Sequence, residues 1–398
     1  MIGSNRWLKF STMKGKSWYK GGMDSPGKMM KFRFSALVVI FFITIGCPDK
    51  EVPQEAGFEA VNVSNTPYRS EDPTMAVGPD GTVYVFWEEW NPDSGGVYYT
   101  YRSPDGKWSD VAFVCKGGSP YAKVDNSGTI HLAYKHDFVI HYIKKPPGGD
   151  WTQPEYITAL GMSCDPKFEI DRWGNIHLIF SELIGAIRIF YSKRSANGGW
   201  WSQPVELNKE AAFHRLHTRI TVNAQGDAFV TWTNVVTDTG PDYILYTTNA
   251  IGDTWSYPVP LNSGILPIAA VFRTDIAVDS WGTIHVIWCD DTHGLLYRYN
   301  KFGMWSAPVV VDSSAGVNSL LEIDQQNRLH VVYDGHPESG IYYRIKKLYG
   351  NWSDRICCLS PRGIPKGMGI YGGDVYTVFA DIVDGEWDIF FVEGRGLY

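Results

Sequence analysis

No segment of this sequence shows the apolar stripe of an amphipathic helix, and long charged runs and low-complexity stretches are also missing. The absence of such runs excludes extensive disorder outside the N-terminal region. There is no glycine-rich phosphate loop, no serine-centred nucleophile elbow and no recognisable thiol nucleophile motif. The sequence therefore offers none of the short signatures that identify common nucleotide-binding proteins and hydrolases.

Cysteine is scarce, with six residues and no Cys-x-x-Cys pair or zinc-binding spacing with histidine. The cysteines stand at positions 47, 115, 164, 289, 357 and 358. Cys357 and Cys358 are adjacent and cannot bridge each other without strain. One long-range disulfide remains open, but buried free thiols are favoured. A carboxylate ring could hold Ca²⁺, yet no spacing specifies a metal, so we expect neither a metal nor another cofactor.

Positive charge is sparse outside the N-terminal region. The formal net charge of the 398-residue chain is −7. Residues 1–46 carry eight Lys and Arg and one Asp, a net +7, so the remainder carries −14. Because an acidic body repels phosphate backbones, we expect no nucleic-acid partner.

The N-terminal region resembles a bacterial lipoprotein signal. Lys31 and Arg33 precede an apolar run over residues 34–45, which is too short for a comfortable transmembrane helix but suits a signal peptide. The run leads into Cys47, and in such signals the cysteine is lipidated and becomes the new N-terminus. Thr44 departs from the usual pattern, in which a leucine-like residue stands three places before the cysteine.

The resemblance implies that the protein is exported to the cell envelope and held at a membrane by a lipid on Cys47. A secreted protein with an ordinary signal peptide is the alternative. We expect residues 1–47 to be the leader, residues 48–56 a tether, and residues 57–398 a single domain.

One phrase recurs through that domain: an apolar residue, Asp, two variable residues, Gly, and then an alternating strand that ends in an aromatic residue. It occurs at 77–87, 124–134, 170–180, 222–232, 278–288 and 323–333, and in a degenerate form at 370–379. In the sixth copy Asn327 replaces the turn glycine, and Asn is the next-best residue for a positive φ angle. Such internal repeats indicate a repeat fold.

A second phrase follows the first: a short aromatic strand, a glycine-containing turn, and then Trp with Ser or Thr after it. It occurs at 97–110, 140–154, 189–204, 244–258, 295–308 and 341–354. Each unit therefore holds four short strands joined by tight turns. Units of about 45–55 residues with four strands are typical of propeller blades. We predict an all-β fold, a β-propeller of about seven four-stranded blades, with six blades as the alternative.

The two ends of the domain suit ring closure. The last unit has expected strands near 367–370, 375–380 and 387–393, and it lacks a fourth. A lone strand at 57–63 precedes the first unit. We expect this strand to complete the last blade, because an unpaired sheet edge is a liability.

The turn between the third and fourth strands resembles the Asp-box of the sialidase-like, BNR-repeat propellers, Ser/Thr-x-Asp-x-Gly-x-Thr-Trp. Residues 248–255 match it except for Ala250 in the Asp place, and residues 195–201 and 103–108 are shortened versions. The resemblance implies a propeller in which these boxes are structural clamps. It says little about activity.

The Phe-Arg-Ile-Pro signature typical of sialidases is absent, and residues 272–275, Phe-Arg-Thr-Asp, are the nearest phrase. A sialidase-type site also has three arginines around the substrate carboxylate. Arg69, Arg215 and Arg273 lie at or just before inner strands and could converge.

Topology locates the working face. The Asp-x-x-Gly turns and the Asp-box-like turns share one face, so the longer and more varied connections lie at the opposite face, where binding sites usually occur. The starts of the first strands and the ends of the second strands meet there, around the mouth of the central channel. Both sets of positions are polar, and we take the strand interiors to be apolar. The candidate ligand-binding residues are Asp72, Glu89, His136, Asp165, Glu182, His217, Arg273, Asp290, Asn318 and Asp381.

Residues that recur at the same position of several blades favour a structural role. They are the histidines at 131, 177, 285 and 330 and the strand-end aromatics Trp87, Tyr134, Phe180, Trp232, Trp288, Tyr333 and Phe379, which we expect to pack between blades. His214, Arg215, His217 and Arg219 break the repeat and give the start of the fourth unit unusual charge.

The sequence leaves two main functions open. The first is a membrane-anchored propeller that binds a glycan or a protein ligand at its channel mouth, with Arg273 as the anchor for a ligand carboxylate. The second is a sialidase-like glycoside hydrolase or a polysaccharide lyase, since paired carboxylates can do acid/base chemistry. No catalytic residue is assigned, and a purely structural assembly protein is the third option.

Overall fold

The computed structural model describes residues 60–157, 161–208, 217–235, 242–250, 252, 254–263, 270–335, 340–347, 350–358 and 363–397. The chain divides into two compact units, residues 1–50 and 51–398, and all described residues belong to the second. All helices and strands assigned among the described residues are β-strands; no helix is assigned there, which confirms the all-β prediction. In this part of the chain no helix is long and apolar enough to cross a membrane. The predicted leader and tether fall outside the described residues.

The strands form seven sheets, which confirms the seven-bladed propeller. Blade 1 consists of β2 (Ser70–Val77), β3 (Val83–Glu89), β4 (Gly96–Arg102) and β5 (Ala112–Cys115). Blade 2 consists of β6 (Gly118–Val124), β7 (Ile130–His136), β8 (Val139–Lys145) and β9 (Glu155–Ile157). Blade 3 consists of β10 (Met162–Ile170), β11 (Ile176–Ile184), β12 (Ala186–Arg194) and β13 (Val205–Glu206).

The next three blades follow the same order. Blade 4 consists of β14 (Arg219–Val222), β15 (Ala228–Asn234), β16 (Tyr243–Thr248) and β17 (Val259–Pro260). Blade 5 consists of β18 (Val271–Val278), β19 (Ile284–Asp290), β20 (Gly294–Lys301), β21 (Met304–Trp305) and β22 (Val309–Asp312). Blade 6 consists of β23 (Ala315–Ile323), β24 (Leu329–Gly335), β25 (Ile341–Lys346) and β26 (Ile356–Cys358).

Blade 7 contains both ends of the domain. It consists of β27 (Ile364–Tyr371), β28 (Asp374–Val383), β29 (Glu386–Gly394) and the N-terminal β1 (Val61–Asn62). Val61 pairs with Phe391 and Asn62 with Phe390, in antiparallel register. The N-terminal strand therefore closes the ring, as predicted.

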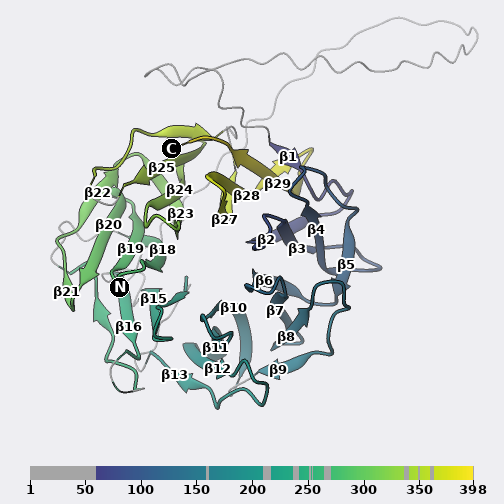
Figure 1. Cartoon of the computed structure of the whole chain (residues 1–398), viewed down its shortest axis with the longest axis horizontal. Coiled ribbons are helices and arrows are strands. Elements are labelled where there is room, and N and C mark those ends of the chain that lie inside the picture. The colour runs from purple at the N-terminus through teal and green to yellow at the C-terminus, as the bar shows by residue number, and fades with distance from the viewer. Residues whose placement is uncertain are drawn as a thin grey trace, which may run out of the picture. The chain divides into compact units, whose positions relative to one another are not determined.

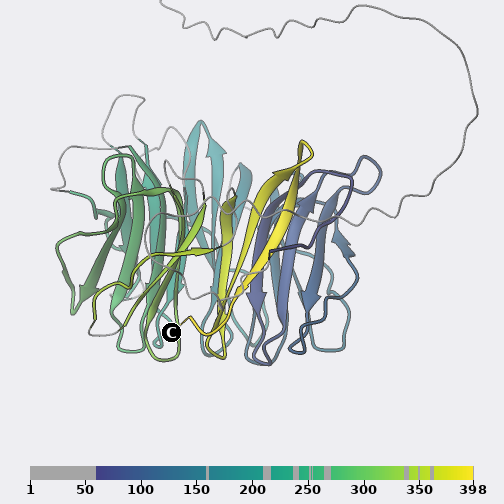
Figure 2. The same cartoon turned by 90° about the horizontal axis from the view of Figure 1, so that it is seen from above.

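The first strand of each blade lies innermost, around the centre of the ring (Figure 1). Each of these strands packs against the first strand of the next blade, and β27 packs against β2. The strands run between two faces (Figure 2). We call the face with the turns between first and second strands the turn face, and the opposite face, where first strands start and second strands end, the mouth face.

Large apolar side chains hold neighbouring blades together. Seven buried clusters each combine residues of two adjacent blades. The strand-end aromatics singled out by the repeat are all almost fully buried in these clusters, which confirms their packing role. Burying such rings removes large apolar areas from water and supplies much of the driving force for ring formation.

The repeated tryptophans clasp the outer parts of the blades. Each packs edge-on against an aromatic ring of the preceding blade, with centroids 4.8–6.2 Å apart. The pairs are Trp108–Phe391, Trp151–Phe86, Trp201–Tyr142, Trp255–Tyr191, Trp305–Tyr246 and Trp352–Tyr297. The tryptophans of the second repeated phrase thus also pack neighbouring blades together.

Candidate functional site

The predicted first-strand residues other than His217 lie in β-bulges at the mouth face. In blades 1 to 3 the bulge residues Asp72, Ser119 and Asp165 have φ angles of 45°, 50° and 51°, and each precedes a proline. Corresponding register shifts in blades 5 to 7 surround Arg273, Asn318 and Lys366. A bulge re-aims a side chain and occurs often beside functional sites.

The interiors of the innermost strands are charged, which corrects our expectation that they are apolar. Lys123 Nζ of blade 2 lies 2.6 Å from the Glu169 carboxylate of blade 3. Arg219 Nε of blade 4 lies 3.4 Å from Oδ1 of Asp275 in blade 5. Because Lys123 also interacts electrostatically with Glu322 of blade 6, these side chains share the central channel.

Four basic side chains from four different blades gather toward the mouth end of this channel. They are Lys167, Arg219, Arg273 and Lys366, and we call them the cation cluster. Lys366 Nζ lies 3.7 Å from Oδ1 of Asp72. The side chains of Arg219 and Lys366 remain 14% and 19% exposed, so the cluster lies deep in the ring yet touches solvent.

The basic groups of the cluster are buried close to one another, which disfavours their charged forms. Burial, and then the nearby Arg219, lower the pKa of Lys167 to about 8 and that of Arg273 to about 10, against attraction from Asp72 and Asp165. Burial and the neighbouring Arg273 also lower the pKa of Lys366. An anion bound among these groups would relieve their mutual repulsion.

Acidic groups lie next to this cluster in the same channel. Burial raises the pKa of Glu322 to about 7, although Lys123 opposes the shift. Burial also raises the pKa of Asp275, whose carboxylate accepts a hydrogen bond of 3.0 Å from the Leu321 amide. The channel thus carries ion pairs and buried acids with raised pKa values beside the basic groups.

Most predicted second-strand residues are engaged inside their own blades. Glu89 accepts hydrogen bonds from Ser70 at 2.7 Å and from the Trp87 indole at 2.8 Å. Glu182 accepts bonds of 2.8 Å from the Ser163 hydroxyl and the Gly161 amide, and both glutamates are buried. These two carboxylates therefore brace strand ends.

Asp290 and Asn318 are also buried in local hydrogen bonds. Asp290 Oδ1 accepts a 2.9 Å bond from the Thr292 amide in the turn before β20. Asn318 donates to Asp334 at 2.6 Å from its side-chain amide. The structure thus brings together Asp72, Asp165 and Arg273 of the ten candidates and ties Glu89, Glu182, Asp290 and Asn318 into their blades.

The remaining candidates occupy different surroundings. His136 ends β7 at the mouth face, with Nε2 3.5 Å from Asp137, and lines a pocket between blades 1 and 2. Asp381 accepts a 2.8 Å bond from the adjacent Ile382 amide. His217 is half-buried just ahead of β14. His214 and Arg215 fall in a segment that the structure does not describe.

The three-arginine arrangement of sialidases receives no support from the residues described. Arg69 pairs with Glu71 and lies over the ring of Trp90. Arg273 instead interacts with Arg219, Asp72, Asp165 and Asp334. Two basic neighbours of Arg273 lie two residues further along their strands than the predicted positions: Lys167 follows Asp165, and Arg219 follows His217. The third, Lys366, lies in the bulge of blade 7. Extending the period-2 alternation inward from the mouth would have found Lys167 and Arg219.

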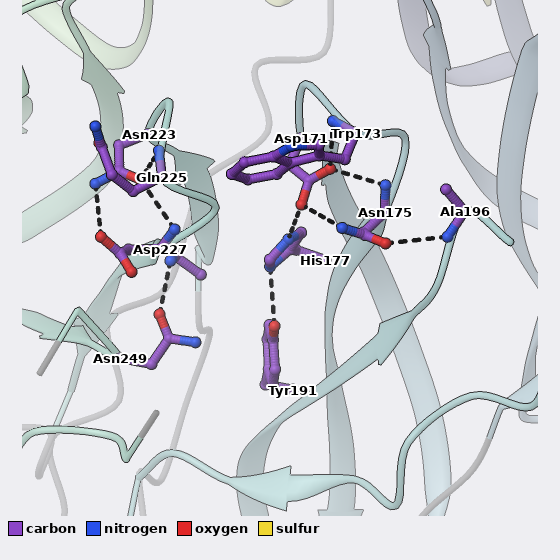
Figure 3. A network of polar contacts seen from close by, with 11 residues as sticks. Asp171, Trp173, Asn175, His177, Tyr191, Ala196, Asn223, Gln225, Asp227 and Asn249 are labelled. Carbon is purple, nitrogen blue, oxygen red and sulfur yellow. Dashed lines mark hydrogen bonds and ion pairs between the residues drawn. The ribbon is translucent and has the colours of Figure 1, made fainter. Parts of the chain in front are cut away.

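The four repeated histidines brace the turn face, as expected for a structural role. In blade 3, His177 Nε2 lies 3.2 Å from Asp171, and its Nδ1 lies 2.9 Å from the Tyr191 hydroxyl (Figure 3). Asp171 also accepts hydrogen bonds from the amides of Trp173 and Asn175, which fold the turn. The same three-residue chain links Asp125–His131–Tyr142, Asp279–His285–Tyr297 and Asp324–His330–Tyr343.

Cys115, Cys164 and Cys289 are free thiols, as favoured by the sequence. Burial raises the pKa of Cys115 to about 12 and that of Cys164 to about 11, so both are protonated at neutral pH. The side chains of Cys357 and Cys358 are outside the described set. Among the described residues, no group of three His, Cys, Asp or Glu side chains is placed to hold a metal ion.

Comparison with known proteins supports the fold and leaves the family open. No family model and no curated protein matches the sequence. Among solved structures, a PL25 ulvan lyase has a TM-score of 0.62 at 12% identity, covering 82% of this chain and 94% of the lyase. A Dyadobacter fermentans protein of unknown function has a TM-score of 0.53 at 13% identity, covering 86% and 99%. A puromycin hydrolase has a TM-score of 0.55 at 14% identity, covering 81% and 52%. At such identities the likeness shows a shared propeller fold alone.

Proposed function

We propose that this protein binds an acidic saccharide at the mouth of its central channel, with the ligand carboxylate held by the cation cluster. The observation that carries the proposal is the convergence of four basic side chains from four blades on one solvent-touching channel. The planar guanidinium of Arg273 suits a carboxylate, because two parallel N–H groups can donate to its two oxygens.

A neighbouring structure agrees with this ligand class. The same ulvan lyase has been solved with a bound saccharide that contains glucuronate, and that complex has a TM-score of 0.61 to this chain. We favour binding over glycoside hydrolysis, because Glu89 and Glu182 are engaged in internal hydrogen bonds and are poorly placed as an acid/base pair.

Replacing Arg273 tests the proposal. Arg273→Ala should weaken binding of methyl β-D-glucuronide by about 2 kcal/mol, the usual cost of losing a charge-assisted hydrogen bond. Calorimetric titration at neutral pH measures the change, and thermal unfolding checks the fold. Arg395→Ala is the matched control, because this arginine is exposed at the end of β29, at the turn face. Equal affinities in both variants would refute the proposed site.

Lys167 favours a polysaccharide lyase as the second candidate. With its pKa lowered to about 8, a fraction of this amine is neutral near pH 7, and Nζ lies 4.8 Å from the ring centroid of Tyr121. A neutral amine could remove the proton next to a uronate carboxylate. The glycosidic C–O bond then breaks, which leaves an unsaturated uronate, and the departing sugar oxygen takes a proton from water to become a hydroxyl. Turnover of uronate polysaccharides to unsaturated products by the wild type, but not by Lys167→Met, would establish the lyase.

We also propose that a lipid on Cys47 holds the exported protein at a membrane. The proposal rests on the apolar run that ends at this cysteine. Cys47→Ser should move the protein from the membrane fraction to the soluble exported fraction, as followed by fractionation and immunoblotting. A wild-type protein without lipid by mass spectrometry, together with an unmoved variant, would exclude the anchor.

A further inference from the structure

A pocket of about 470 Å³ opens on the mouth face between blades 1 and 2. Its volume is within the usual range for small-molecule sites, about 300–1,000 Å³. The walls come from the end of β3, the loop into β4, the start of β6 and the end of β7. The residues that matter for recognition are Glu88, Trp90, Gly118, Lys135, His136 and Asp137.

One wall is an exposed aromatic ring. Trp90 directly follows β3 and is 58% exposed, although large apolar side chains in this fold are mostly buried between blades. The Arg69 guanidinium lies 5.9 Å from its ring centroid, and the Trp90 amide donates a 2.9 Å hydrogen bond to the Arg69 carbonyl. The ring is therefore held in place while keeping apolar surface in water, which suits the apolar face of a sugar ring.

Another part of the pocket is polar and includes a glycine that Glu88 approaches closely. Glu88 accepts a 3.0 Å hydrogen bond from the Ser119 amide. A Cβ atom on Gly118 would lie 1.9 Å from a Glu88 carboxylate oxygen, so only glycine allows this approach. Burial raises the pKa of Glu88. The pocket thus combines an acid with Lys135 and His136, which can contact sugar hydroxyls.

The hairpin beside His136 has an unfavourable backbone. Asp137 and Phe138 have φ angles of 47° and 61°, where glycine is preferred, and Phe138 is exposed. Strained conformations of this kind gather at ligand sites. The Phe138 carbonyl accepts a 2.8 Å bond from the Ser163 amide of blade 3, which helps to hold the hairpin.

We propose that this pocket binds a neutral sugar ring stacked on Trp90. Three acids, Glu88, Glu89 and Asp137, line the pocket beside Lys135 and His136, so the pocket has no excess of positive charge to attract an acidic sugar. Glu88 interacts electrostatically with Asp72, which pairs with Lys366 of the cation cluster. If the proposed function holds, the natural ligand is a saccharide of mixed composition, with its acidic unit at the channel and a neutral unit in this pocket.

Ligand-observed NMR with the methyl glycosides of glucose, galactose, xylose, mannose and rhamnose tests the pocket. At least one should bind to the wild type, and Trp90→Ala should weaken it about tenfold, the effect of losing an aromatic platform. His136→Ala should weaken the same glycoside. Trp200→Ala is the control, because Trp200 is 97% exposed in a turn-face loop of blade 3. Thermal unfolding verifies that each variant is folded.

Different experimental results would contradict the channel site and the pocket. Loss of methyl β-D-glucuronide binding in Arg273→Ala with unchanged neutral-glycoside binding supports two subsites. If the wild type binds neutral glycosides but no glucuronide, the proposed function fails and the pocket stands. If none of the five neutral glycosides binds, or if folded Trp90→Ala and His136→Ala bind them as the wild type does, the pocket proposal is wrong.

Discussion

Lys167 and Arg273 keep their charge where the surroundings oppose it. Both lie deep in the ring, and both face other cations, so their pKa values are lowered. Attraction from Asp72 and Asp165, and from Asp334 in the case of Arg273, opposes this lowering. A site of this kind gains more from an anionic ligand than an exposed pair of basic residues would, because screening by water is weaker there.

The lowered pKa of Lys167 predicts a pH-dependent affinity. Lys167 is a cation below its pKa of about 8 and neutral above it, so glucuronide binding should weaken as the pH rises through about 8. The ligand carboxylate stays ionised over this range. Lys167→Arg should bind with little change over the same interval, because arginine remains charged. Calorimetric titrations across this interval measure both, and a wild-type affinity that does not depend on pH would contradict the assignment.

At the scale of single elements, the polar groups of the turn between the first two strands hydrogen-bond to one another. A carboxylate binds the turn amides on one side and a histidine on the other, and the histidine reaches a tyrosine of the third strand (Figure 3). Burial lowers the pKa of His131, His177 and His330. The neutral histidine is therefore part of the folded turn.

These histidines predict a loss of stability in acid. Their pKa values in the folded state lie below the unfolded value of about 6.5. Their contribution to the free energy of unfolding is therefore complete above about pH 6.5 and falls as the pH drops toward the folded-state pKa. The double variant His177→Phe with Tyr191→Phe should lose part of this dependence, because blade 4 already has Phe229 at the histidine position. Urea unfolding at about pH 5 and about pH 8 measures the difference. Tyr191→Phe alone should show the same change in unfolding free energy between the two pH values as the wild type. If the double variant also shows that change, His177 is not the source of the pH dependence.

At the scale of the whole molecule, the ring depends on a join between distant parts of the chain. Asp388 of β29 accepts a 3.0 Å hydrogen bond from the Asn62 side chain and a 3.2 Å bond from the Ser64 hydroxyl. The Val63 amide donates to the Ile389 carbonyl at 2.8 Å. The join thus buries polar groups whose partners lie more than three hundred residues away in sequence.

Removing the closing strand should destabilise the whole propeller. Deletion of residues 57–66 would leave the β29 edge unpaired and Asp388 without these partners, and each orphaned buried group costs about 1–3 kcal/mol. We expect a marked fall in the thermal unfolding midpoint and in solubility. Deletion of the predicted tether, residues 48–56, is the control and should leave the midpoint unchanged. An unchanged midpoint in the longer deletion would show that the join contributes little.

The sequence alone determined the architecture, because a propeller repeats one local pattern. The Asp-x-x-Gly turns, the period-2 strands and the repeated aromatics each act within a blade or between neighbours, so their spacing predicted seven blades and the closing strand. The roles of His177 and Trp288 followed from the same logic, since a residue type that recurs at one position of several blades serves the blade structure.

Only the tertiary structure decided which polar residues share a site. Glu89 and Arg273 are both polar residues at strand ends, yet Glu89 turns into its own blade and Arg273 lies among the channel charges. Lys167, Arg219 and Lys366 stand far apart in sequence and meet because ring closure brings blades 3, 4 and 7 around one axis. Local spacing specifies a turn or a strand, whereas a shared channel depends on side-chain direction and on contacts between distant blades, which the spacing does not contain.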